Sequence, residues 1–163
     1  MSTLTTVSVV LAMLGSALIA GVFFAFSSFI MKALGRVPAS EGIAAMQSIN
    51  VVVINPTFLG TFLGTAVLSL LVAALAINGW GTSSAPFFLG GALSYLVGTF
   101  LVTGLGNVPL NERLAAVSMT DSEAVEVWDH YLDRWTLLNT IRTVAAGAAA
   151  VMFTLGLMQG GAG

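Results

Sequence analysis

The sequence contains no cysteine among its 163 residues. Disulfides, zinc–thiolate sites, iron–sulfur clusters and thiol nucleophiles all depend on cysteine, so each of them is excluded. Histidine is nearly as scarce, because His130 is the only one. A single histidine cannot provide a haem with two histidine ligands or a zinc ion with three protein ligands. We therefore expect no metal and no cofactor, unless neighbouring chains supply ligands to a shared haem or metal.

Charged residues are the second scarcity. Only 7% of the residues are charged and 57% are hydrophobic, with a mean hydropathy of +0.98. Soluble domains carry about 25% charged residues, so five basic and seven acidic side chains cannot cover a water-soluble surface. The net charge of -2 and the scattered basic residues also exclude nucleic acid as a partner. The composition predicts one integral membrane domain, residues 1–163, with the lipid bilayer as its partner.

Four apolar stretches are long enough to cross a membrane. A bilayer core of about 30 Å requires about 20 apolar residues in a helix. The predicted spans are residues 7–31, 56–78, 86–108 and 138–158. No lysine or arginine precedes the first stretch, so we expect it to be a retained helix rather than a cleaved signal. The predicted fold is all-α, an integral membrane four-helix bundle.

The segments around these spans set the expected boundaries and orientation. Asn55 and Pro56 predict the start of the second helix, Pro109 the end of the third, and Ser40 the start of a short amphipathic helix at the interface. Thr120 and Glu123 form a capping box that predicts a long fourth helix, whose polar first half projects from the membrane. All basic residues lie on one side, which favours a cytoplasmic membrane location with both loops in the cytoplasm and both termini outside.

One face of the fourth helix concentrates aromatic and polar side chains. Five residues fall within an arc of about 80° at 100° per residue. They are Trp128, Tyr131, Trp135, Asn139 and Arg142. A structural interpretation is that the aromatics lie at the interface, the arginine reaches the headgroups and the asparagine bridges helices. A functional interpretation is that Asn139 and Arg142 hold an anionic or carbonyl oxygen while Trp128 and Trp135 wall a flat ligand.

Further amides lie at the matching depth of the other helices. Asn107 and Asn111 flank the end of the third span, and Asn50 and Asn55 precede the second. Each of them could be a helix cap or could join a shared polar site. His130 lies about 200° from Trp128 around the helix, which favours a solvated surface histidine over a catalytic base.

Three segments together resemble the anthrone oxygenase-like family of small membrane proteins. They are residues 45–50 (AMQSIN) followed by Asn55 and Pro56, residues 107–111 (NVPLN), and the run from Trp128 through Trp135 to Asn139 and Arg142. The resemblance implies a four-helix membrane protein that converts an anthrone to an anthraquinone with dioxygen and without a conventional cofactor.

The resemblance also directs the choice of site residues. We expect Arg142, Asn139 and Asn111 to be catalytic, as donors to the oxygen of a substrate enolate. The residues expected to bind a flat lipophilic aromatic substrate are Asn107, Trp128, Trp135, Tyr131, Asn50 and Asn55. No base for deprotonating the substrate is identified.

A non-catalytic function stays open as the alternative. The same aromatic and amide face could bind a lipid, a quinone or a partner helix, and the glycines of the third span allow a homo-oligomer.

Overall fold

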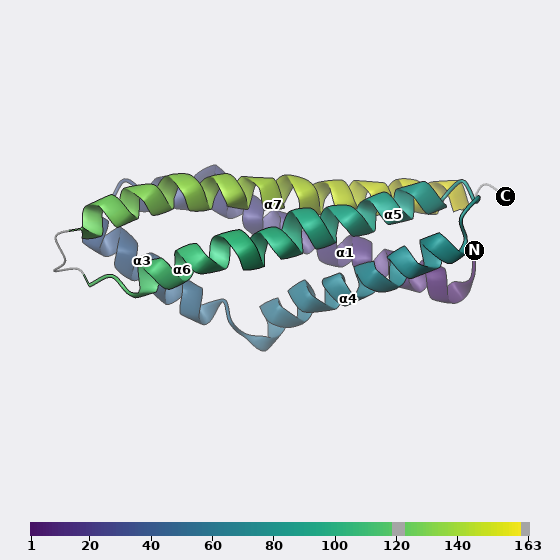
Figure 1. Cartoon of the computed structure of the whole chain (residues 1–163), viewed down its shortest axis with the longest axis horizontal. Coiled ribbons are helices and arrows are strands. Elements are labelled where there is room, and N and C mark those ends of the chain that lie inside the picture. Colours follow the sequence, from purple (N-terminus) through teal and green to yellow (C-terminus); the bar gives the residue numbers. More distant parts are fainter. Residues whose placement is uncertain (119–122, 161–163) are drawn as a thin grey trace.

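The computed structural model describes residues 1–118 and 123–160, and over these residues the chain contains helices and no strand (Figure 1). Four of the helical runs are long and apolar enough to cross a membrane. They are Thr3–Leu34, Pro56–Asn78, Ala85–Ala115 and Ala124–Gly160. The predicted all-α four-helix bundle with a long fourth helix is confirmed, and the apolar helices indicate an integral membrane protein.

The first run combines α1 (Thr3–Ala25), a π-helical turn η1 (Phe26–Ile30) and α2 (Met31–Leu34). Ser2 caps α1, because its side chain accepts a hydrogen bond from the Thr5 backbone N–H at 3.1 Å. A short helix α3 (Ala39–Val52) follows. The predicted cap at Ser40 is wrong, because Ser40 lies inside α3 and Pro38 occupies the cap position without a side-chain hydrogen bond.

Helix α4 (Pro56–Asn78) begins where the sequence predicts. The Asn55 side chain accepts a hydrogen bond from the Phe58 N–H at 3.0 Å, and Pro56 occupies the first turn, where its missing N–H has no partner to lose.

The third run combines α5 (Ala85–Leu93), η2 (Ser94–Leu101), η3 (Thr103–Asn107) and α6 (Val108–Ala115). The prediction that this helix ends near Pro109 is wrong, because α6 continues it to Ala115. Pro109 cannot donate the hydrogen bond that an α-helix would form to the Leu105 carbonyl. The π-helical η3 directly precedes this position, and a π-bulge is one of the ways in which a helix absorbs such a break.

Helix α7 (Ala124–Gly160) is the longest element, and it packs against α1, α5 and the π-helical turns. The predicted capping residue Thr120 lies outside the described residues. The start of α1 and the end of α7 lie at one end of the elongated bundle, and α3, α6 and the start of α7 lie at the other (Figure 1). We call these the terminal end and the loop end.

Charge separates the two ends. Among the described residues, every charged side chain except Arg142 is exposed, and all of the exposed ones lie at the loop end. They are Lys32, Arg36, Glu41, Glu112, Arg113, Glu123, Glu126, Asp129, Asp133 and Arg134. Arg142 is therefore the exception that the fold has to accommodate.

Two clusters of buried side chains fill the bundle. The terminal cluster joins the four long helices through residues such as Val9, Val72, Ala92 and Phe153. The loop-end cluster joins α3, α6 and the first half of α7, and its buried members are Met31, Ile43, Met46, Leu114, Ala124, Val127, Trp128, Tyr131 and Trp135. The candidate site lies where the two clusters meet.

Candidate ligand site at the junction of the two clusters

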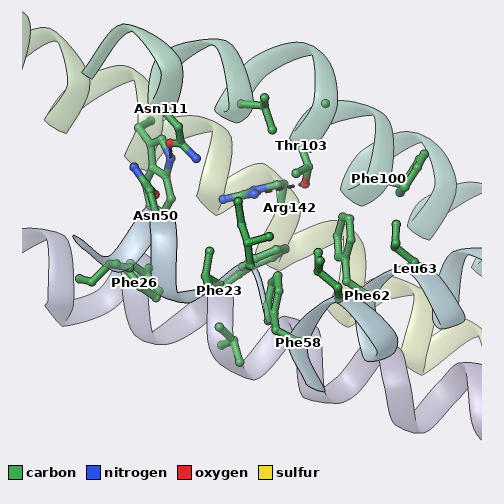
Figure 2. Close-up of a pocket in the computed structure, with 18 of the residues that line it drawn as sticks. Phe23, Phe26, Asn50, Phe58, Phe62, Leu63, Phe100, Thr103, Asn111 and Arg142 are labelled. Atoms are coloured by element: carbon green, nitrogen blue, oxygen red, sulfur yellow. Dashed lines mark hydrogen bonds between the residues drawn. The ribbon is translucent and has the colours of Figure 1, made fainter. Parts of the chain in front are cut away.

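A cavity of about 430 Å³ lies between α1, α4, the η2–η3–α6 segment and α7 (Figure 2). Its volume falls in the range of about 300 to 1,000 Å³ that is typical of small-molecule sites. Six aromatic rings contribute to its wall, those of Phe23, Phe26, Phe58, Phe62, Phe100 and Trp135. Within residues 1–118 and 123–160, the polar residues of the lining are Asn50, Thr103, Asn111 and Arg142. The cavity therefore suits a largely apolar ligand with few polar atoms.

Arg142 reaches this cavity from α7 while only 4% of its surface is exposed. Its Nη1 donates to Thr103 Oγ1 at 3.1 Å, and its Nη2 donates to Asn139 Oδ1 at 2.7 Å. Its guanidinium carbon lies 4.1 Å from the centroid of the Phe23 ring and 5.2 Å from that of Trp135. These cation–π contacts offset part of the cost of burying the charge.

The charge of Arg142 nevertheless has no anionic partner among the residues that the structure describes. Its hydrogen-bond acceptors are neutral, and its Nε is buried without any acceptor. Burying an unpaired charge in a low-dielectric interior costs several kcal/mol, so such residues in membrane segments usually mark functional sites. A negatively charged oxygen in the cavity would supply the missing counter-charge.

Asn139 supports Arg142 from behind and does not line the cavity. Its amide nitrogen donates to the Phe23 carbonyl and to Ser27 Oγ, both at 2.7 Å. These two bonds leave its oxygen facing Nη2 of Arg142. Ser27 belongs to η1, so the π-helical turn of the first run helps to hold the arginine in place.

Asn111 is oriented by a second set of hydrogen bonds. Its Oδ1 accepts from the hydroxyl of Tyr131 and from Nε1 of Trp135, both at 2.8 Å. The indole N–H is only a donor, so the atom that it meets must be the amide oxygen. The amide nitrogen consequently lies on the other side, and Figure 2 shows it pointing from α6 toward Arg142. Asn111 and Arg142 thus offer N–H donors to the same part of the cavity.

The remaining predicted site residues lie at different distances from the cavity. Asn50 lines it and donates to the Tyr131 hydroxyl at 3.4 Å. Asn107, Trp128, Tyr131 and Asn55 do not line it. Asn107 donates to the Trp135 carbonyl at 3.2 Å, which joins η3 to α7.

Trp128 packs against α3 and is 2% exposed. A Cβ added at Gly42 would lie 2.6 Å from its Cζ2 atom, so this glycine allows the indole to approach the α3 backbone. The Tyr131 ring stacks on Trp128 and Trp135, with centroids 5.8 and 5.9 Å apart. Asn55 caps α4.

His130 and the acidic residues of α7 are exposed, on the outer side of the helix. The described residues contain no group of three histidine, cysteine, aspartate or glutamate side chains that could hold a metal ion.

Sequence reasoning missed much of the wall. Phe58 and Phe62 of α4 stack with their centroids 6.0 Å apart, and Phe100 and Thr103 face them from the third run. The four-residue spacing of Phe58 and Phe62 was the one available signal, because it places both rings on one helix face.

A search of curated proteins and a search of solved structures found no match. A family model described as anthrone oxygenase matches residues 49–152, which is more than half of the chain. The matched segment includes Trp135 and all four of the described polar residues that line the cavity, namely Asn50, Thr103, Asn111 and Arg142. The chain therefore belongs to the anthrone oxygenase family.

Proposed function

We propose that this protein is a membrane oxygenase that converts an anthrone-like aromatic compound to a quinone with dioxygen and without a cofactor. The observation that carries the proposal is the buried, uncompensated charge of Arg142 at the wall of an aromatic-lined cavity. The family provides the reaction class. The cavity provides a reason why a flat substrate with one acidic oxygen would bind.

The reaction needs only a stabilised carbanion and dioxygen. The methylene carbon of the anthrone loses a proton, and the molecule becomes an enolate whose charge resides largely on the oxygen of the former carbonyl group. The enolate transfers one electron to dioxygen, and the resulting carbon radical and superoxide combine to form a C–O bond. The peroxide takes up a proton to become a hydroperoxide. The second methylene proton then leaves as the carbonyl forms and the O–O bond breaks, and the released hydroxide takes up a proton to become water. One methylene and one dioxygen thus become one carbonyl and one water.

Arg142 and Asn111 are the proposed donors to the enolate oxygen. Donors that are fixed before the reaction, in a site with little water, stabilise developing negative charge without having to reorganise. The hydrogen bond that Arg142 donates to Asn139, and those that Asn111 accepts from Tyr131 and Trp135, provide this fixation. The aromatic rings of the wall would contact the faces and edges of the substrate rings.

Among the described residues, none that lines the cavity carries a carboxylate or an imidazole. We therefore propose that the methylene proton passes to water, and that Arg142 favours this ionisation because a nearby cation lowers the pKa of an acid. The same lack of a base favours one rival, a protein that binds an already ionised lipophile and performs no chemistry.

The test is the rate of anthrone oxidation in membranes that contain the protein, measured by oxygen uptake and by quinone absorbance against empty membranes. The wild-type protein should exceed the spontaneous rate, and Arg142→Met should lose about 100-fold, the usual cost of removing an oxyanion donor. Arg134→Met is the matched control, because it removes an exposed cation from the same helix. Equal rates for Arg142→Met and wild type would exclude the proposed role of Arg142. Wild-type rates equal to those of empty membranes would exclude anthrones as substrates.

A further inference from the structure

The cavity has a rim of apolar side chains that face outward from the bundle. Ile54 is 69% exposed and Leu105 is 79% exposed, and both line the cavity. Leu63 of α4 and Leu101 of η2 are also exposed while lining it. A side chain that is both cavity-lining and exposed marks a place where the cavity meets the surroundings, so the mouth lies between α4 and the third run.

The backbone leaves room at this mouth. Helix α4 packs against α5 and η2, and Figure 1 shows α4 and the third helical run diverging from the turn that joins them toward the loop end. Gly104 of η3 lines the cavity, and a Cβ added there would meet no atom within 4 Å. The space beside Gly104, at the wall of the cavity, is therefore not filled by side chains of the described residues.

The mouth lies at the level of the apolar part of the helices. Leu105 and Leu101 of the mouth precede Glu112, the first charged residue of their helical run, by seven and eleven positions. At about 1.5 Å per residue these separations are roughly 10 and 16 Å along a helix. The mouth is thus lined by hydrocarbon side chains and lies away from the charged residues of the loop end. A surrounding membrane offers acyl chains rather than water at this depth.

We propose that this mouth is a lateral portal through which a lipophilic acid moves from the bilayer into the cavity, with its flat apolar body among the phenylalanines and its acidic oxygen toward Arg142. This inference rests on the proposed function in one respect, namely that the cavity beside Arg142 is the ligand site. The substrate class is a membrane-dissolved aromatic compound with one ionisable oxygen. Dioxygen is apolar and can take the same path.

The experiment measures how fast a non-reacting analogue reaches the cavity. The probe is 2-anthracenecarboxylate, a flat tricyclic anion, added to vesicles that contain a Trp80→Phe parent, and the signal is saturable energy transfer from the tryptophans at the loop end to the probe. Gly104→Phe places a ring in the open space at the mouth and should slow association at least about tenfold. Gly60→Phe is the matched control, because Gly60 also faces open space but does not line the cavity.

Association of the probe with Gly104→Phe at the parent rate would overturn the portal. Weaker binding with an unchanged association rate would also overturn it, since Gly104 would then lie in the binding site and not on the path. Because the readout is binding, it is independent of turnover. If Gly104→Phe slows association of the probe but the protein oxidises no anthrone, the portal is supported and the proposed reaction is rejected. If the protein oxidises anthrone but Gly104→Phe associates at the parent rate, the reaction is supported and the portal is rejected.

Discussion

The two ends of the bundle use different means to hold helices together. Near the terminal end, helices approach through glycine: an added Cβ at Gly91 would lie 2.7 Å from the Phe153 ring, and one at Gly98 would collide with Ala145. At the loop end, large side chains fill the space, with Trp128, Tyr131 and Trp135 stacked in a row. Close packing of helix backbones leaves no room for a ligand. Where helices diverge and large rings lie between them, space for a ligand remains.

The buried polar groups of the two regions differ in charge, since those without a hydrogen-bond partner near the terminal end are the neutral hydroxyls of Ser16 and Ser69. The buried hydroxyl of Tyr95 donates to the Phe62 carbonyl at 3.0 Å, so this group is satisfied within the protein. Arg142, at the junction with the loop end, keeps an unpartnered Nε and a charge without a counter-charge. A buried neutral group in a membrane bundle is thus accounted for by packing, whereas a buried charge without a counter-charge indicates a missing anionic partner.

The largest effect on helix packing near the terminal end is expected at Gly91. Replacing it with leucine forces a side chain into Phe153 and against the Ala149 carbonyl, 3.2 Å from the added Cβ. Overpacking of this kind costs about 1 to 3 kcal/mol, which would lower Tm by roughly 3 to 10 °C. The measurement is thermal unfolding in detergent, with Gly60→Leu as the control because no atom lies near its added Cβ. Equal losses in the two variants would show that glycine packing does not stabilise the terminal end.

Much of the fold could be predicted from the sequence, because length and hydropathy suffice to identify membrane-crossing helices. The periodicity of the fourth helix also placed five side chains on one face, and all five are buried: Trp128, Tyr131, Trp135, Asn139 and Arg142. Their roles in binding or catalysis stay predictions.

The cavity itself could not be predicted. Helices in lipid are apolar on all sides, so hydropathy does not reveal which face of α4 turns inward. For this reason it does not identify Phe58 and Phe62 as residues of the cavity wall. The π-helical turns η1 and η3 also lack a clear sequence signal, yet they place Ser27 behind Asn139 and carry the third run past Pro109. Both features depend on contacts between helices far apart in sequence.

A smaller effect is expected at Tyr131. Its substitution distinguishes a role in positioning Asn111 from a role in packing alone. Tyr131→Phe removes one of the two donors that hold the Asn111 oxygen, and one hydrogen bond is worth about 0.5 to 1.5 kcal/mol, or roughly 2- to 10-fold in affinity. The loss should fall on the preference for 2-anthracenecarboxylate over neutral anthracene, measured by energy transfer in vesicles. Tyr95→Phe is the counterpart in the terminal cluster and should leave this preference unchanged. A similar change in both variants would reduce the role of Tyr131 to packing.

The smallest effect is expected at His130. It carries the one imidazole in the chain and is therefore an obvious candidate for the base that deprotonates the substrate. Its side chain is exposed, and the face of α7 that reaches the cavity is the one that carries Trp135 and Arg142. If methylene deprotonation needs only water and the charge of Arg142, His130→Gln should oxidise anthrone within about twofold of wild type, since substitutions on exposed surfaces are usually nearly neutral. A tenfold loss at unchanged protein abundance would mean that a proton path from the loop end reaches the substrate. The cavity would then act with a base outside its own wall, and the proposed ionisation by water would have to be abandoned.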